Sequence, residues 1–132
     1  MAAAANTKYL IKGGNKIVVN VTGIFDTADE TDTVIIDVST LVGPDGTPPT
    51  GVRIDEVTWA VGAGFDHILL EWDATTDDVI DYFQGQGYMD FRPYGGKHDP
   101  KSTGTTGDVL LTGSGGAAGD TYSFLICATL QD

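Results

Sequence analysis

The side chains best suited to chemistry are carboxylates, which gather in two clusters. The first lies within seven residues and consists of Asp26, Asp29, Glu30 and Asp32. The second consists of Glu71, Asp73, Asp77, Asp78 and Asp81. Converging carboxylates bind Ca²⁺, and a facing pair can hydrolyse a glycosidic bond. The first cluster lacks the alternating pattern of a calcium loop, and Asp77 and Asp78 also suit the start of a helix. We therefore interpret the first cluster as solvated turn acids, and we expect neither a metal site nor glycosidase activity from the two clusters.

The other reactive side chains are too few and too isolated to predict a catalytic set. His67 and His98 are 31 residues apart and have no metal-ligand partner at a defined spacing. Cys127 is the single cysteine and lies in an apolar run, which is typical of a small buried side chain. The glycine-rich segment 113–119 lacks the Gly-Lys-Ser/Thr of a phosphate loop. The sequence thus predicts a protein that is not an enzyme and that uses no metal or cofactor.

Charge is strongly unbalanced, with 7 basic and 19 acidic side chains and a net charge of −12. Such a surface repels phosphate backbones, so nucleic acid is not an expected partner. The first 25 residues are the exception, because they hold Lys8, Lys12 and Lys16 and no acid. These lysines either protect an exposed strand edge from aggregation or dock the protein on an acidic partner or a neighbouring copy. The pattern allows both interpretations.

The elements that position these side chains are short β-rich runs separated by Gly, Pro and Asp turn signals. The runs cover residues 7–12, 16–25, 33–39, 52–61, 65–73, 88–94, 108–112 and 121–130. Residues 75–84 fit a short capped helix, a strand or an ordered loop. Ile54 is out of phase with the rest of its run, which predicts a bulge near Asp55 and Glu56. Eight or nine strands in one chain predict an all-β, two-sheet antiparallel sandwich of the jelly-roll or a related Greek-key type.

The domain organisation follows from length and composition. A chain of 132 residues fits one domain, which we place at residues 7–132 after a flexible arm of residues 1–6. No segment approaches the roughly 20 apolar residues that cross a bilayer, and residues 1–6 do not resemble a signal peptide. We therefore expect no membrane partner. Residues 121–130 are apolar on both faces, which is typical of a strand at the centre of a sandwich or in an interface.

A contact surface is predicted for the aromatic-rich stretch of residues 82–94. Its aromatic and methionine side chains are Tyr82, Phe83, Tyr88, Met89, Phe91 and Tyr94. Aromatic residues and methionine are enriched at protein interfaces. The same aromatic rings also suit stacking on sugars in a lectin-like groove. Both interpretations describe a binding function rather than catalysis.

Three segments give the chain a resemblance to a known class of proteins. They are Thr7–Asn15 (TKYLIKGGN), Trp72–Asp78 (WDATTDD) and Gly87–Gly96 (GYMDFRPYGG). They resemble small β-sandwich virion proteins of tailed bacteriophages, which are encoded beside head genes and often act as capsid decoration or cement proteins. The resemblance runs over most of the chain.

This resemblance implies a non-enzymatic structural protein on the exterior of the capsid, made in the host cytoplasm. Its partners would be the major capsid protein and further copies of itself, with a trimer favoured over a dimer. The expected contact residues are the basic segment with Lys8, Lys12 and Lys16 and the aromatic stretch 82–94. A carbohydrate-binding module and a tail- or fibre-associated adhesion protein are the alternatives.

Overall fold

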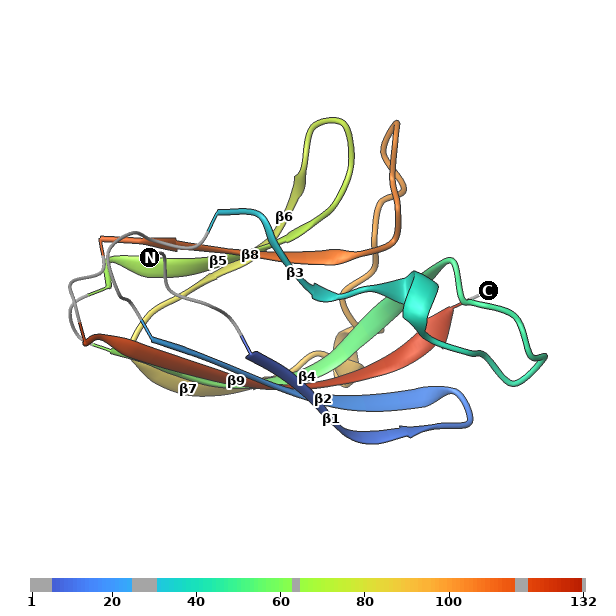
Figure 1. Ribbon diagram of the computed structural model, residues 1–132, viewed down its shortest axis with the longest axis horizontal. Helices are drawn as coiled ribbons and strands as arrows, with labels where there is room; N and C mark the ends of the chain where they lie inside the picture. Colours follow the sequence, from blue (N-terminus) through green and yellow to red (C-terminus); the bar gives the residue numbers. More distant parts are fainter. Residues whose placement is uncertain (1–5, 25–30, 63–64, 116–118, 132) are drawn as a thin grey trace.

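The computed structural model describes residues 6–24, 31–62, 65–115 and 119–131 (Figure 1). These residues form nine strands and two short 3₁₀ turns, and they contain no α-helix. The strands are β1 Asn6–Gly13, β2 Lys16–Ile24, β3 Thr33–Ile36, β4 Gly51–Val61, β5 His67–Trp72, β6 Asp78–Phe83, β7 Gln86–Asp90, β8 Val109–Ser114 and β9 Thr121–Gln131. The 3₁₀ turns cover Val38–Thr40 and Arg92–Tyr94. The protein is all-β, as the sequence predicts.

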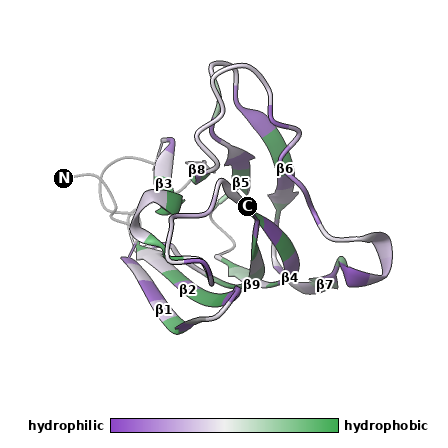
Figure 2. Cartoon of the chain, turned by 90° about the vertical axis from the view of Figure 1, so that its right-hand side faces the viewer, coloured by the Kyte–Doolittle hydropathy of each residue, from purple (hydrophilic) through white to green (hydrophobic). Residues whose placement is uncertain are grey.

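The strands form two antiparallel sheets that lie face to face (Figures 1 and 2). One sheet has five strands in the order β1-β2-β9-β4-β7, and the other has four in the order β3-β8-β5-β6. The pairs β2·β9, β3·β8, β4·β7 and β5·β6 nest inside one another along the chain. A long hairpin wrapped in this way is a jelly roll, so the predicted fold class is confirmed. Strand β1 extends the five-stranded sheet beyond β2.

Alternating side chains fill the space between the two sheets. The buried residues of β2 are Ile17, Val19 and Val21, and those of β9 include Tyr122, Phe124, Ile126 and Ala128. From the other sheet, Trp72 and Phe83 are the largest fully buried side chains. The Phe83 ring meets the Phe124 ring edge-on at 5.2 Å between centroids, so the two layers share one core. Because the inward positions make this core, the outward positions of each sheet remain available for contacts.

The predicted bulge in β4 is confirmed. The register between β4 and β9 skips one residue between Ile54 and Glu56, which leaves Asp55 without a partner across the sheet. The backbone around the bulge is still satisfied, because Asp55 O accepts from the Phe91 N–H at 2.8 Å and Ile54 exchanges two hydrogen bonds with Lys97. The extra residue turns the Asp55 side chain into a position that regular alternation would not give it.

Residues 75–84 resolve to the strand alternative rather than the helix. Strand β6 pairs with β5, and its Ile80 and Phe83 reach the core. Two predicted runs end early, since β3 stops at Ile36 and β7 stops at Asp90, each followed by a 3₁₀ turn. Asn6 belongs to β1, so it is not part of an arm; residues 1–5 of that predicted arm lie outside the described residues.

Charge is divided unequally between the two sheets. The strands of the five-stranded sheet carry four basic side chains, Lys8, Lys12, Lys16 and Arg53, and three acidic ones, Asp55, Glu56 and Asp90. The strands of the four-stranded sheet carry Glu71, Asp78 and Asp81 and no lysine or arginine. The five-stranded sheet is therefore the nearly neutral layer of a chain whose net charge is −12.

Candidate binding surface

The outer face of the five-stranded sheet presents rows of side chains that the strand register aligns. The middle row consists of Lys8, Asn20, Leu125, Thr58 and Tyr88. The rows beside it consist of Ile11, Val18, Cys127, Glu56 and Asp90, and of Asn6, Thr22, Ser123, Ala60 and Gln86. The part of these rows on β2, β9 and β4 that bears no charge is here called the uncharged face, and it comprises Val18, Asn20, Thr22, Thr58, Ala60, Ser123, Leu125 and Cys127. Leu125 lies at its centre and is 36% exposed.

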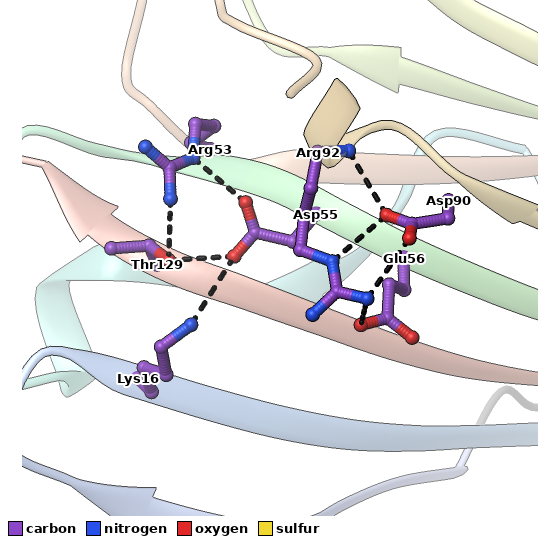
Figure 3. Close-up of polar contacts among 7 residues, drawn as sticks. All are labelled: Lys16, Arg53, Asp55, Glu56, Asp90, Arg92 and Thr129. Atoms are coloured by element: carbon purple, nitrogen blue, oxygen red, sulfur yellow. Dashed lines mark hydrogen bonds and ion pairs between the residues drawn. The ribbon is translucent and has the colours of Figure 1, made fainter. Parts of the chain in front are cut away.

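The bulge of β4 places a buried carboxylate at one end of this face. The Asp55 side chain is 3% exposed. Figure 3 shows it surrounded by Arg53, Thr129 and Lys16. Arg53 Nε donates to Asp55 Oδ1 at 2.7 Å, and the Thr129 hydroxyl donates to Oδ2 at 2.6 Å. Arg53 also donates to the Thr129 oxygen at 3.2 Å, which closes a three-membered ring of hydrogen bonds. Lys16 Nζ stands farther away, at 3.7 Å from Oδ2.

These contacts keep Asp55 ionised. Burial by itself would raise the pKa of the Asp55 carboxyl, but hydrogen bonds from Arg53 and Thr129 and the charges of Arg53 and Lys16 outweigh burial, so the pKa lies below its usual value. A buried charge is tolerated only when it is paired and hydrogen-bonded. The group therefore acts as a fixed internal anchor between β4, β9 and β2.

A second set of charges lies beside Asp55, on β4, at the end of β7 and just after it. Together the two sets are called the polar network, which consists of Lys16, Arg53, Asp55, Glu56, Asp90, Arg92 and Thr129 (Figure 3). Arg92 binds Asp90 with two hydrogen bonds of 2.9 Å and pairs with Glu56 at 3.1 Å (Figure 3). The Tyr88 hydroxyl donates to the other Glu56 oxygen at 2.8 Å. Hydrogen bonds from Arg92 lower the pKa of Asp90, and the bond to Glu56 raises the pKa of Tyr88. Each of these charges has a partner within the chain.

Two hollows interrupt the outer face, one at each end. The larger, of about 450 Å³, is lined by Asn6, Thr22, Gly23, Ile24, Ala60, Thr121, Tyr122 and Ser123. The smaller, of about 220 Å³, lies beside the polar network and is lined by Ile11, Lys16, Ile17, Val18, Asp55, Glu56, Arg92, Cys127 and Ala128. Between them lies Leu125. A partner surface could therefore insert side chains at both ends of the face while it covers the centre.

The three predicted contact lysines separate into two environments. Lys8 and Lys12 lie on β1, which is an edge strand, as their protective interpretation requires. Lys12 Nζ stands over the Tyr9 ring at 5.1 Å. Lys16 begins β2 and belongs to the polar network. A docking role for all three lysines stays a prediction, and only Lys16 lines a hollow of the face.

The predicted aromatic contact surface is not continuous. Phe83 and Phe91 are 2% and 5% exposed and belong to the core, so their expected contact role is wrong: both rings fill space between the sheets. Tyr82 lies on β6 of the four-stranded sheet, whereas Tyr88 lies on the outer face of the five-stranded sheet. The exposed Met89 and Tyr94 lie on β7 and on the following 3₁₀ turn. The segment alternates between core and surface instead of presenting one side.

The structure brings together acids that come from different parts of the sequence. Carboxylate oxygens of Asp32, Glu71 and Asp77 all lie within 4.8 Å of one another, a geometry that could hold a metal ion. Partial burial and the charges of Asp77 and Asp32 raise the pKa of Glu71. Asp32 belongs to the first sequence cluster. Its N–H donates to the Thr112 hydroxyl of β8, and that hydroxyl donates to the Asp32 carboxylate. Asp26, Asp29 and Glu30 lie outside the described residues.

Replacing Glu71 with glutamine is expected to stabilise the protein at pH 7 by about 0.5–1 kcal/mol, because it removes repulsion among like charges on one face. The pKa of Glu71 is raised in the fold, so the ionised form is the disfavoured one and wild-type stability falls as the pH rises through that pKa. Urea unfolding at pH 7 and pH 4 measures the difference in unfolding free energy between Glu71→Gln and the wild type. The stabilisation by Glu71→Gln must be smaller at pH 4 than at pH 7. Asp45→Ala is the control of opposite sign, because Asp45 accepts two hydrogen bonds from Thr47.

The histidines and the cysteine occupy ordinary structural positions. His67 meets the Tyr82 ring edge-on at 5.1 Å, and a His98 ring nitrogen lies 2.8 Å from the Gly95 carbonyl oxygen. Burial, followed by the charges of Glu56 and Asp55, raises the pKa of the Cys127 thiol, which disfavours the reactive thiolate. Within the described ranges, neither histidine is hydrogen-bonded to a carboxylate or a nucleophile.

Comparison of the chain with known protein families, curated proteins and solved structures finds no match. In the part of the chain that the structure describes, there is no helix with the length and apolar character to span a membrane.

Proposed function

We propose that this chain is a non-enzymatic virion structural protein that binds the outside of a phage capsid lattice through the outer face of its five-stranded sheet. The observation that carries the proposal is the uncharged face itself. Eight adjacent outward positions bear no charge in a chain with a net charge of −12. A protein that remained free in solution would gain solubility from acids on this sheet as much as on the other.

The size of the face supports a protein partner. The whole outer face of the five-stranded sheet, with strands about 4.8 Å apart and on average about 30 Å long, presents about 700 Å². Each partner in an interface of standard size buries about 800 Å². The face also has the composition of an interface centre, because charge is confined to its margin and Leu125 stands in the middle. Docking by this face turns the acidic four-stranded sheet toward solvent.

The carbohydrate-binding alternative receives less support. A sugar-binding groove would need several rings on one side, but Tyr82 and Tyr88 lie on different sheets, and Phe83 and Phe91 are buried. The resemblance to phage virion proteins favours a capsid as the partner over a glycan.

The proposal is tested by mixing the purified protein with capsids that lack it and sedimenting the particles. We expect saturable binding at a fixed number of copies per capsid, which electron microscopy should locate as repeated density on the outer surface. The five-stranded sheet should face the lattice. Absence of saturable binding would refute the proposal, and reproducible binding to a glycan array without capsid binding would favour the alternative.

A further inference from the structure

The smaller hollow of the outer face combines apolar and charged side chains. Its apolar lining, called the floor, consists of Ile11, Ile17, Val18, Cys127 and Ala128. Its charged lining consists of Lys16, Asp55, Glu56 and Arg92. Ile11 is 57% exposed although it is aliphatic. A space of about 220 Å³ is large enough for one side chain of the size of leucine or phenylalanine. This hollow is called the Lys16 pocket below.

Three of the four charged groups at the pocket are already paired, and Asp55 is held by Arg53 and Thr129 at 2.7 and 2.6 Å. Glu56 holds the Tyr88 hydroxyl with one oxygen and Arg92 with the other, at 2.8 and 3.1 Å. Arg92 is also held by Asp90 through two hydrogen bonds of 2.9 Å. The charge of Arg92 is thus shared by two carboxylates, and both Glu56 oxygens are occupied.

Lys16 differs from Arg92 because no carboxylate of the described residues holds its ammonium group at hydrogen-bond distance. Its distance of 3.7 Å to Asp55 Oδ2 is too long for a hydrogen bond, and its side chain is 62% exposed. The same Asp55 oxygen already accepts from Thr129 at 2.6 Å. Among the described residues, this ion pair is the only polar contact of Lys16 Nζ. The pocket thus presents one cation without a close carboxylate partner beside an apolar floor.

We propose that the Lys16 pocket receives an aliphatic side chain of a partner protein together with an adjoining carboxylate that binds Lys16 Nζ. The aliphatic part would cover Ile11, Val18 and Cys127, and the carboxylate would supply the acceptor that Lys16 lacks. In the capsid setting the partner is a surface segment of the capsid protein, so this part of the inference rests on the proposed function. The pocket chemistry itself can be tested without capsids.

The first experiment uses 4-methylpentanoate, which combines a leucine-like chain with a carboxylate, and 4-methylpentanamide as the matched uncharged probe. Titrations followed by the backbone NMR signals of Val18 and Cys127 should give saturable shifts with the acid at millimolar concentrations. The amide should bind about 5-fold more weakly, since it lacks the charge. Equal binding of acid and amide, or no shifts at these residues, would overturn the proposal.

Variants then separate the two parts of the pocket. Lys16→Gln should weaken binding of the acid by about 5-fold and leave the amide unchanged. Cys127→Leu should fill the floor and weaken both probes by at least about 10-fold. Lys8→Gln is the matched control, because Lys8 lies on the same outer face but does not line the pocket. If Lys8→Gln weakens binding of the acid as much as Lys16→Gln does, the acid is attracted by the overall positive charge of the face and not by the pocket. That result would contradict the pocket assignment.

Capsid binding by the same variants tests the partner. Lys16→Gln and Cys127→Leu should each lower capsid occupancy, and Lys8→Gln should do so less. If both pocket variants bind capsids like the wild type, the pocket is not the capsid contact and the proposal fails. If the wild type does not bind capsids at all, the proposed function fails, whereas acid-selective binding of the small probe would still support the pocket.

Discussion

Replacing Leu125 with aspartate is expected to reduce capsid binding by at least about 100-fold while the protein stays folded. Leu125 stands at the centre of the outer face, between Asn20 on β2 and Thr58 on β4. In the free protein the new carboxylate would be solvated, because this position is already 36% exposed. In the bound state the carboxylate would be buried without a partner, which costs several kcal/mol. Sedimentation with undecorated capsids gives the affinity, and circular dichroism with urea unfolding confirms the fold.

The matched control is Val34→Asp on the four-stranded sheet. Val34 is 45% exposed and pairs with Leu110 of β8, so it receives the same change at a similar exposure on the opposite side of the sandwich. Its capsid binding should equal that of the wild type. Comparable losses from both variants would show that added negative charge alone prevents binding, and the five-stranded face would lose its special role.

The sequence was sufficient to predict the architecture, because short β-rich runs and the turn residues between them can be recognised from neighbouring residues alone. Apolar residues on both faces of β9 predicted a strand at the centre of a sandwich or in an interface, and β9 is the middle strand of its sheet. The out-of-phase Ile54 located the bulge in β4. The ambiguous segment 75–84 could not be decided locally, because Val79 and Ile80 suit either element. Pairing with β5 and core packing of Phe83 select the strand, and both are contacts between distant residues.

The binding surface was far less predictable than the fold. Its residues come from β2, β4 and β9, so the face exists only once the register aligns Val18, Cys127 and Glu56 in one row. Aromatic composition pointed instead to residues 82–94, where alternation sends Phe83 inward and Tyr82 outward. The polar network was missed for the same reason. The predicted bulge near Asp55 was the available signal for the network, because bulges often redirect a side chain at a functional site.

Replacing Asp55 with alanine is expected to lower the free energy of unfolding by about 2–4 kcal/mol at pH 7. The change removes the acceptor for Arg53 and for Thr129, and it leaves the Arg53 guanidinium with one contact inside the network, to the Thr129 oxygen. Breaking a buried ion pair from one side is costly because the remaining charge has no counterpart. Arg53 is one-third exposed, at 33%, so water recovers part of the loss and the expected cost is smaller than for a fully buried ion pair.

The pH dependence identifies the carboxylate as the source of this effect. The pKa of Asp55 is lower in the fold than its usual value of 3.8, so its stabilisation is complete above that value and is lost as the pH falls through the lowered pKa. The difference in unfolding free energy between wild type and Asp55→Ala should therefore be constant from pH 5 to 7 and narrow below about pH 4. Asp90→Ala removes a carboxylate that is more exposed than Asp55, so it should destabilise the protein less than Asp55→Ala does. If the difference in unfolding free energy for Asp55→Ala persists undiminished at pH 2, side-chain packing rather than the ion pair holds β4 to β9. In that case the Lys16 pocket would owe its shape to the backbone bulge and not to the buried charge.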